Sequence, residues 1–295
     1  MKIALVDVDG RNFPNLALMK LAAWHKAQGD SVEWYDPLFI RPDRIYASKV
    51  FTFTPDFQDY AAGDPEPIRG GTGYDPSVKL PDEVEQMIPD YSLYPDFPDA
   101  IGFLTRGCIR NCPWCIVPKK EGSLREVDDI ERVAAGRKEV VLLDNNFLAA
   151  DKEFVREQLE KAARLRLKLD FNQGLDARLV TPENARLLAA CRWIRYIRFS
   201  CDTVAMIEPI RSAVKLVREA GFRREIFVYM LVNDIGDAET RLRALVDLNV
   251  IPFAQPYRDF TGDSTPTAEQ RKFASFVNVK GGKLCRKMSF EEYYK

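Results

Sequence analysis

The sequence predicts an α/β protein: a partial (β/α)6 barrel with a small α/β domain in front of it. From residue 99 to residue 260, apolar runs of strand length alternate with amphipathic stretches of helix length. This alternation favours a parallel sheet with helical crossovers. The chain has 295 residues, of which 46% are hydrophobic and 29% charged. It is therefore long enough and apolar enough to bury a sizeable core.

Residues 1–60 predict a small α/β domain of Rossmann-like topology. Residues 2–8 are a continuous apolar run typical of a buried strand, and 14–28 have helical spacing before Gly29. Residues 31–35 and 43–53 are expected to be further strands. In 61–98 prolines and glycines crowd together. We therefore expect this segment to be a connector on the surface rather than a packed layer.

The barrel is expected over residues 99–260. The helix signals are local: Asp151 and Thr181 are good N-caps, Pro182 suits a first helical turn, and Gly221 suits a helix end. Residues 261–295 form a tail that is basic in its middle, which we expect to be a short helical appendage. The expected strands are 100–105, 139–143, 168–172, 194–200, 225–232 and 250–254, and the expected helices are 128–135, 152–165, 182–190, 208–220 and 238–249.

Charge and apolar patterning predict a cytoplasmic protein. The formal charge of −1 gives no global attraction to nucleic acid or to an acidic membrane. Asp7 and Asp9 interrupt the apolar start of the chain, so no signal peptide is expected, and no apolar run reaches membrane-spanning length. Cytoplasmic thiols stay reduced, so clustered cysteines favour a metal site or catalysis over disulfides.

Three of the six cysteines, Cys108, Cys112 and Cys115, have the spacing C-x-x-x-C-x-x-C after the first barrel strand. Three thiolates on one loop can bind three irons of a cubane cluster, which leaves the fourth iron open to a small molecule. The alternative is a structural zinc site. Zinc needs a fourth ligand, and the remaining candidates, Cys191, Cys201, Cys285 and His25, are all distant in sequence.

The spacing, its position and the aromatic Trp114 before the third cysteine resemble the radical S-adenosylmethionine superfamily over roughly residues 99–260. The resemblance implies a 4Fe–4S cluster on Cys108, Cys112 and Cys115, whose open iron chelates S-adenosylmethionine, with Trp114 near the adenine. Reductive cleavage would then give a 5'-deoxyadenosyl radical that abstracts hydrogen from a small-molecule, peptide or nucleobase substrate. An external reductant of the flavodoxin or ferredoxin type is implied, and no membrane partner is expected.

The same resemblance implies cofactor contacts at four strand ends. Where many members have Gly-Gly-Glu, this chain has Asp144, Asn145 and Asn146, which could accept from the methionyl amine or could form a helix-capping turn. Arg178 could hold the methionyl carboxylate, or could form a surface ion pair. The candidate cofactor contacts are Trp114, Asp144, Asn145, Asn146, Gln173, Asp176, Arg178, Ser200, Asp202 and Gln255.

The front domain resembles a shortened version of the cobalamin-binding domain of some radical enzymes. Those that ligate cobalamin carry Asp-x-His-x-x-Gly after the first strand, where this chain has Asp7, Asp9 and Gly10 but no histidine. The only histidine, His25, lies in a helix pattern. Cobalamin ligated by this domain is therefore not expected. Cobalamin held by shape alone stays open, as does a degenerate domain that serves substrate binding or assembly.

Three hypotheses about function remain at this stage. The first is a radical enzyme whose catalytic residues and substrate the sequence does not identify. The second is a radical methyltransferase or methylthiotransferase on nucleic acid, and the third is a non-catalytic zinc or iron–sulfur module. Cys201 could donate a hydrogen atom but reads more simply as a small buried hydrophobe. An auxiliary cluster on Cys191, Cys201 and Cys285 is a further alternative.

Overall fold

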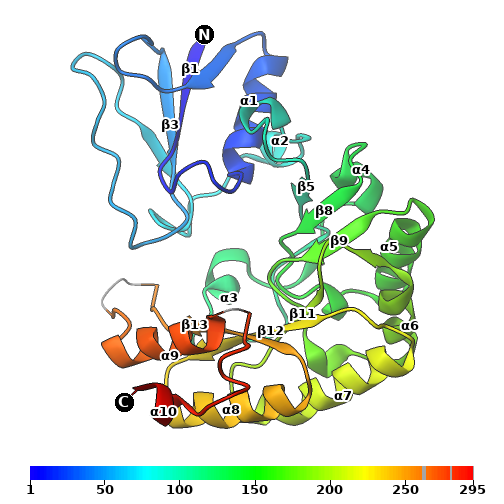
Figure 1. Ribbon diagram of the computed structural model, residues 1–295. Helices are drawn as coiled ribbons and strands as arrows, with labels where there is room; N and C mark the ends of the chain where they lie inside the picture. The colour runs from blue at the N-terminus through cyan, green and yellow to red at the C-terminus, as the bar shows by residue number, and fades with distance from the viewer. Residues whose placement is uncertain (261–263, 280, 295) are drawn as a thin grey trace. The chain divides into compact units, whose positions relative to one another are not determined.

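A computed structural model describes residues 1–260, 264–279 and 281–294 of the chain. The protein is mixed α/β and is built on parallel sheets (Figure 1). It divides into two compact units, Met1–Pro98 and Asp99–Lys295. The predicted α/β class is confirmed at this level. The division falls at residue 99, where the sequence changes from the proline-rich segment to regular alternation.

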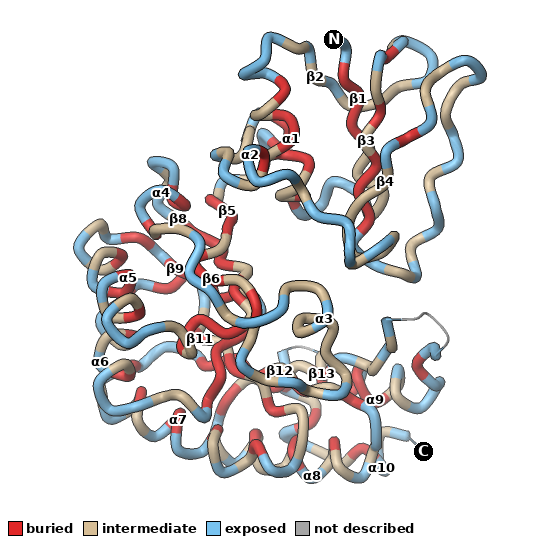
Figure 2. Tube along the Cα trace, turned by 180° about the vertical axis from the view of Figure 1, so that it is seen from behind, coloured by how far each residue is buried: buried red, intermediate tan, exposed pale blue. Residues whose placement is uncertain are grey.

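The first unit is a four-stranded parallel sheet in the order β2-β1-β3-β4. Buried residues gather along β1, β3 and α1 (Figure 2). Asn15 caps α1 by accepting from the Leu18 amide, and this fixes where the helix begins. The elements are β1 (Lys2–Asp7), α1 (Leu16–Ala27), β2 (Ser31–Trp34), β3 (Arg44–Ser48), β4 (Ile68–Gly70), α2 (Asp82–Glu85) and the 3-10 turn η1 (Tyr91–Leu93).

The segment 61–98 belongs to this unit, and the expectation of a surface connector is wrong for part of it. Its strand β4 pairs with β3 through Ile68, Arg69 and Gly70. Farther along, the Tyr94 hydroxyl donates to the Asp7 carboxylate at 2.6 Å. A three-residue strand among prolines and glycines is too short to show a two-residue period, so its pairing is a tertiary effect.

In the second unit the strands pair in chain order. One parallel group is β10-β9-β8-β5 and the other is β11-β12-β13. A single parallel bridge between Leu175 and Phe199 lies between the two groups. The strands are β5 (Ala100–Gly102), β6 (Thr105–Arg106), β7 (Arg125–Glu126), β8 (Glu139–Leu142), β9 (Lys168–Phe171), β10 (Arg192–Trp193), β11 (Ile197–Ser200), β12 (Ile226–Val232) and β13 (Ile251–Pro256).

Helices follow the strands as the sequence predicts. Thr181 forms a capping box with Asn184, with Pro182 in the first turn, and Asp151 caps the helix before it. The helices are α3 (Val117–Glu121), α4 (Ile130–Ala134), α5 (Lys152–Arg164), α6 (Pro182–Ala190), α7 (Ile207–Glu219), α8 (Ile235–Asp247), α9 (Ala268–Asn278) and α10 (Phe290–Tyr294); the 3-10 turns are η2 (Phe147–Ala149), η3 (Ala177–Leu179) and η4 (Val204–Met206).

The C-terminal residues are part of the second unit rather than an appendage to it. Residues 261–263, 280 and 295 of the expected tail lie outside the described residues. Helix α9 buries Phe273, Phe276 and Val277, and it lies beside β13 in the way the earlier helices lie beside their strands. The sequence missed this because the basic residues around the helix masked its apolar face.

The outer edge of β13 is closed to pairing. The Ala254 amide donates to the Asn278 side chain at 2.8 Å, and the Asn278 amide donates back to the Ala254 carbonyl at 2.9 Å. Because backbone groups alternate along a strand, Pro252 and Pro256 face the same edge as Ala254. Proline has no N–H to donate. Over Ile251–Pro256 this edge therefore presents no free donor.

Candidate functional site

The three clustered cysteines lie on a loop whose base is a short antiparallel ladder. Strands β6 and β7 pair Thr105 with Glu126 and Arg106 with Arg125. Gly107 follows with φ +81°, and a Cβ there would lie 2.3 Å from the Ser123 carbonyl oxygen. Only glycine fits this position. The ladder thus holds together the two ends of the loop, and the three cysteines lie in the chain between these ends.

The loop's thiols are half-buried and none forms a disulfide. The Arg110 amide donates to Cys108 Sγ at 3.3 Å, and the Asn146 side chain donates to the same sulfur at 3.4 Å. Burial raises the pKa of the Cys112 and Cys115 thiols above the ordinary value, and the charge of the neighbouring cysteines raises it further. The three sulfurs therefore share one local environment.

At the end of β8 the three predicted polar residues have three different roles. Asp144 is buried and accepts from the Leu104 and Thr105 amides and from the Thr105 hydroxyl, at 3.1, 2.6 and 2.7 Å. Burial raises the pKa of Asp144 to about 6. This carboxylate ties β8 to the segment that enters the cysteine loop. Its oxygens are engaged inside the fold, which differs from the cofactor contact expected for it.

Asn145 and Asn146 point toward the cysteine loop. Asn145 donates to Glu121 at 2.9 Å. Asn146 is buried and donates to Cys108 and, over 3.5 Å, to Asp176. The Asn146 side-chain oxygen is buried and has no hydrogen-bond partner. A buried acceptor left unpaired costs about 1–3 kcal/mol, so this oxygen is suited to a donor that arrives with a ligand.

The end of β9 supplies a charged cluster. Asp176 accepts from both ends of the Arg178 guanidinium, at 2.7 and 3.0 Å, and from Arg110 Nε at 3.0 Å. Burial alone would raise the pKa of Asp176, but the two guanidinium groups outweigh it and hold the pKa below the ordinary value. Gln173, predicted beside these residues, is exposed at the turn before Gly174. The structure thus brings Arg178 and Asp176 to the cysteine loop and leaves Gln173 in solvent.

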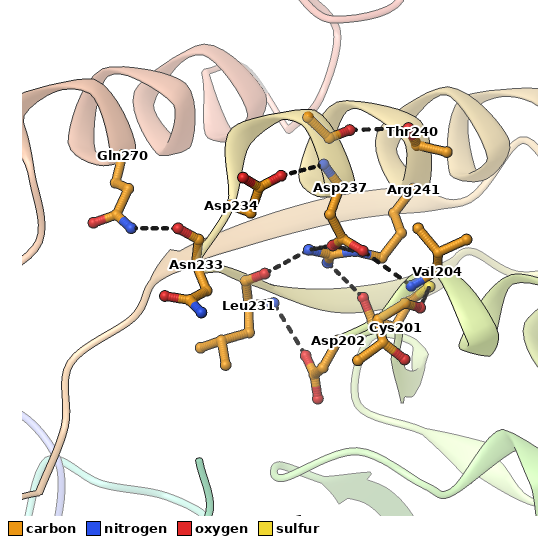
Figure 3. Close-up of polar contacts among 12 residues, drawn as sticks. Cys201, Asp202, Val204, Leu231, Asn233, Asp234, Asp237, Thr240, Arg241 and Gln270 are labelled. Atoms are coloured by element: carbon orange, nitrogen blue, oxygen red, sulfur yellow. Dashed lines mark hydrogen bonds and ion pairs between the residues drawn. The ribbon is translucent and has the colours of Figure 1, made fainter. Parts of the chain in front are cut away.

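The ends of β11 and β12 are held by a buried arginine of α8. Arg241, which is 1% exposed, donates to the Cys201 and Leu231 carbonyls, both at 2.8 Å, and pairs with Asp237 (Figure 3). Asp202 follows Cys201 and accepts from the Leu231 amide at 3.0 Å. Burial raises the pKa of Asp202. Its charge also raises the pKa of the Cys112 and Cys115 thiols, so Asp202 lies within electrostatic reach of the cysteine loop.

The remaining predicted contacts lie around this centre. Trp114 and Ser200 are half-buried, and Gln255 is exposed on β13. Gln255 is paired in register with Leu231, the residue that binds Asp202 through its amide. Ser200 is the last residue of β11, directly before Cys201 and Asp202.

Two residues of this site were missed by the sequence. Glu121 accepts from the Gly107 amide and from Asn145, both at 2.9 Å, and pairs with Arg106 at 3.5 Å. Arg110 lies between the first two cysteines and reaches Asp176. A glutamate at the end of a five-residue helix and an arginine inside a loop look like solvent-facing charges, so the sequence gives no signal for either.

The other three cysteines are buried and separate. Cys191 donates to the Leu159 carbonyl at 3.5 Å, and Cys285 donates to the Gly282 carbonyl at 3.2 Å. Cys201 lies near the Thr203 carbonyl at 3.9 Å. In the part of the chain that the structure describes, no group of three or more His, Cys, Asp or Glu side chains is arranged to hold one metal ion. Each of these three cysteines thus lies against a backbone carbonyl of its own.

The donor set of the loop fits a cubane cluster. Each thiolate of such a cluster ligates its own iron, so the three sulfurs need not meet at one point. The site has three thiols of one short loop, a charged Arg110–Asp176–Arg178 cluster beside them, and Asn146, which donates to Cys108 and keeps an unpartnered side-chain oxygen. This combination can accept both a metal cluster and a zwitterionic ligand.

Comparison with known proteins gives no family for the chain. No model of a known protein family matches the sequence, and no curated protein matches it either. Among the described residues, no helix is long and apolar enough to cross a membrane.

Proposed function

We propose that the chain is a radical S-adenosylmethionine enzyme whose cluster is held by Cys108, Cys112 and Cys115. The observation that carries the proposal is Asn146, whose side-chain nitrogen donates to the Cys108 sulfur while its buried side-chain oxygen has no hydrogen-bond partner. When bound, the cluster and S-adenosylmethionine supply reductive cleavage of a sulfonium and hydrogen abstraction from a substrate. The substrate, whether a small molecule, a peptide or a nucleobase, is not specified by the site.

The chain's own residues would bind and orient the cofactor. Asn146 offers its oxygen to an ammonium group, and Arg178 has a guanidinium to share with a carboxylate. Asp202 lies at the next strand end, where a carboxylate can accept from ribose hydroxyls. Trp114, half-buried beside Cys115, offers a ring for stacking on adenine. An external flavodoxin-type or ferredoxin-type reductant would deliver the electron.

We also propose that the second unit is a partial (β/α)6 barrel. The strands β5, β8 and β9 pair in chain order, as do β11, β12 and β13, and the Leu175–Phe199 bridge joins the two groups. On one face of β11–β13 Ile197, Phe199, Val228 and Ala254 are buried, whereas Arg198, Ser200, Tyr229 and Phe253 of the other face are half-buried. This asymmetry is expected for a curled sheet with helices outside and a cavity inside.

Anaerobic reconstitution with iron and sulfide tests the proposal. We expect about four irons per chain, and 5'-deoxyadenosine when S-adenosylmethionine and dithionite are added. A colourless protein that takes up one zinc and produces no 5'-deoxyadenosine would contradict the proposal and would favour the zinc module instead.

A further inference from the structure

The opposite edge of the second unit, where the parallel strands begin, is strongly basic. The segments that enter β8, β9, β10, β11 and β12 carry exposed lysines and arginines, although the whole chain has a net charge of −1. Strands β8, β9 and β10 are parallel neighbours in one group, and β11 and β12 are parallel neighbours in the other. The segments that enter the strands of each group lie at the same end of that group, and Arg224, before β12, donates to the Trp193 and Ile194 carbonyls at the end of β10. We name this surface the basic edge; its exposed residues are Lys138, Arg164, Arg166, Lys168, Arg192, Arg195, Arg223 and Arg224.

Few acidic groups offset this charge. Glu139 pairs with Lys168, Asp99 before β5 lies within electrostatic reach of Arg137 and Lys168, and Glu225 lies next to Arg224. In the described part of the chain Arg164, Arg166, Arg192 and Arg195 form no ion pair. Exposed cations usually alternate with anions on a protein surface, so an accumulation of one sign at one edge creates a local positive potential.

Helix ends account for only part of the charge. Helices that follow parallel strands end at this edge, and cations there interact favourably with the helix dipole. Arg218 and Arg223 serve in this way, since Arg218 donates to the Phe222 carbonyl and Arg223 donates to the Arg218 carbonyl. Among the residues that the structure describes, Arg192 and Arg195 donate to no carbonyl at a helix end, so this explanation does not cover them.

One part of the basic edge is hollowed. Arg195, Tyr196, Arg224 and Glu225 line an open depression of about 510 Å³. The Arg224 guanidinium is fixed there by the Trp193 and Ile194 carbonyls. The Tyr196 ring is half-buried and stacks on Phe227, with 5.1 Å between the ring centroids. The two guanidinium groups can bind phosphate, and the aromatic ring offers a surface on which a base can stack.

We propose that the basic edge binds the phosphate backbone of a single-stranded nucleic acid. Arginine predominates over lysine on this surface, and the hollow adds a ring, which favours nucleic acid over a plain anionic surface. The interaction is independent of the cysteine site. Loss of nucleic-acid binding would leave the proposed radical chemistry intact, and a failure of cluster assembly would leave the basic edge intact.

Fluorescence anisotropy with RNA and DNA oligonucleotides of about 20 nucleotides tests the proposal on the full chain. We expect binding that weakens steeply between about 50 and 200 mM salt. The variant R192E/R195E should weaken binding about tenfold and reduce the slope of log K against log salt by about 1.4, since each lost phosphate contact on a single strand contributes about 0.7. The relative affinities for the RNA and DNA oligonucleotides identify the preferred kind of nucleic acid.

The matched control is K152E/R186E, which reverses two exposed charges on α5 and α6 and produces the same net charge. It should bind within about twofold of the wild type, because a local contact is lost only at the basic edge. R164E on the neighbouring segment gives a second test if R192E/R195E does not fold. Absence of salt-dependent binding, equal weakening by the control, or binding to vesicles of phosphatidylserine but not to oligonucleotides would overturn the proposal.

Discussion

The two units differ in whether the polar groups at the carboxyl ends of their parallel strands are hydrogen-bonded within the chain. In the first unit the chain satisfies its own strand ends: Asp9 accepts from the Val50 and Phe51 amides and from the Thr54 hydroxyl, and Asn15 donates to Ser48. In the second unit the corresponding edge keeps three free thiols and the unpartnered Asn146 oxygen.

This difference indicates where a ligand is needed. Ligands of open parallel sheets bind outside the carboxyl ends of the strands. In the first unit the Asp9 carboxylate accepts from the segment after β3, at the carboxyl end of the strands. The comparison favours the second unit as the ligand-binding one.

The largest effect is expected from the double substitution C112A/C115A. It should abolish iron uptake and lower 5'-deoxyadenosine production by more than about 100-fold, since a cubane needs its thiolates. The control is Cys191→Ala, which removes a buried thiol and should cost about 1 kcal/mol of stability while leaving the iron content unchanged. Loss of iron in the control would instead favour an auxiliary centre that includes Cys191.

A second prediction concerns Asp144, whose buried carboxyl has its pKa raised to about 6. A raised pKa means that the folded state holds the proton more tightly. The stability that this provides is present below the ordinary pKa of 3.8 and is lost as pH rises through about 6. Asp144→Asn cannot ionise. The wild type should therefore lose about 2 to 3 kcal/mol relative to the variant between pH 4 and pH 8.

Chemical unfolding of both proteins at several pH values measures this difference. Asp9→Asn in the first unit is the control, because it makes the same change at a carboxylate that is only half-buried and lies in the other unit. If the difference in the free energy of unfolding between wild type and Asp144→Asn stayed constant across this pH range, Asp144 would be ionised throughout. The raised pKa of its buried carboxyl would then be contradicted.

Asn146→Ala should weaken S-adenosylmethionine binding about tenfold, because it removes one hydrogen bond to a charged group. Calorimetry on the reconstituted protein gives the dissociation constant, and circular dichroism gives the folded fraction. Gln173→Ala is the matched control, since Gln173 is exposed and should change the affinity less than twofold by the same reasoning. Equal effects in both variants would mean that Asn146 does not face the ligand.

The smallest effect is expected for Asp9→Ala. Its exposed partners, the Val50 and Phe51 amides, can return to water, so the cost should be about 1 kcal/mol. Hydrogen exchange should become faster in the segment after β3, with unchanged iron content and unchanged 5'-deoxyadenosine production. Acquisition of cobalamin binding by this variant would show that Asp9 blocks a site that the fold still retains.

The sequence predicted the elements of the second unit well because their signals are local. Thr181, Pro182 and Asp151 mark helix starts, and the apolar runs mark strands, so no distant contact is needed to find them. Strand β4 and the packing of helix α9 against the second unit were missed because both depend on contacts with β3 and β13. Local pattern does not report such packing.

The candidate site was predictable in outline only. The three cysteines and the polar strand ends are visible in sequence, and the structure gathers Asn146, Asp176, Arg178 and Asp202 near the cysteine loop. The inward direction of Asp144 could not be predicted, because it is set by the path of β5 and β6. The burial of Glu121 depends in the same way on the return of the loop to its base.

The closed outer edge of β13 has a consequence for the behaviour of the protein at high concentration. An exposed strand edge normally recruits the edge of another molecule, and this is a common route to aggregation. This edge of β13 has no free backbone N–H donor, because Asn278 accepts from the Ala254 amide and prolines occupy positions 252 and 256. Copies of the chain therefore cannot join their sheets along β13. Replacing Asn278 should make the protein prone to self-association without touching any residue of the cysteine site.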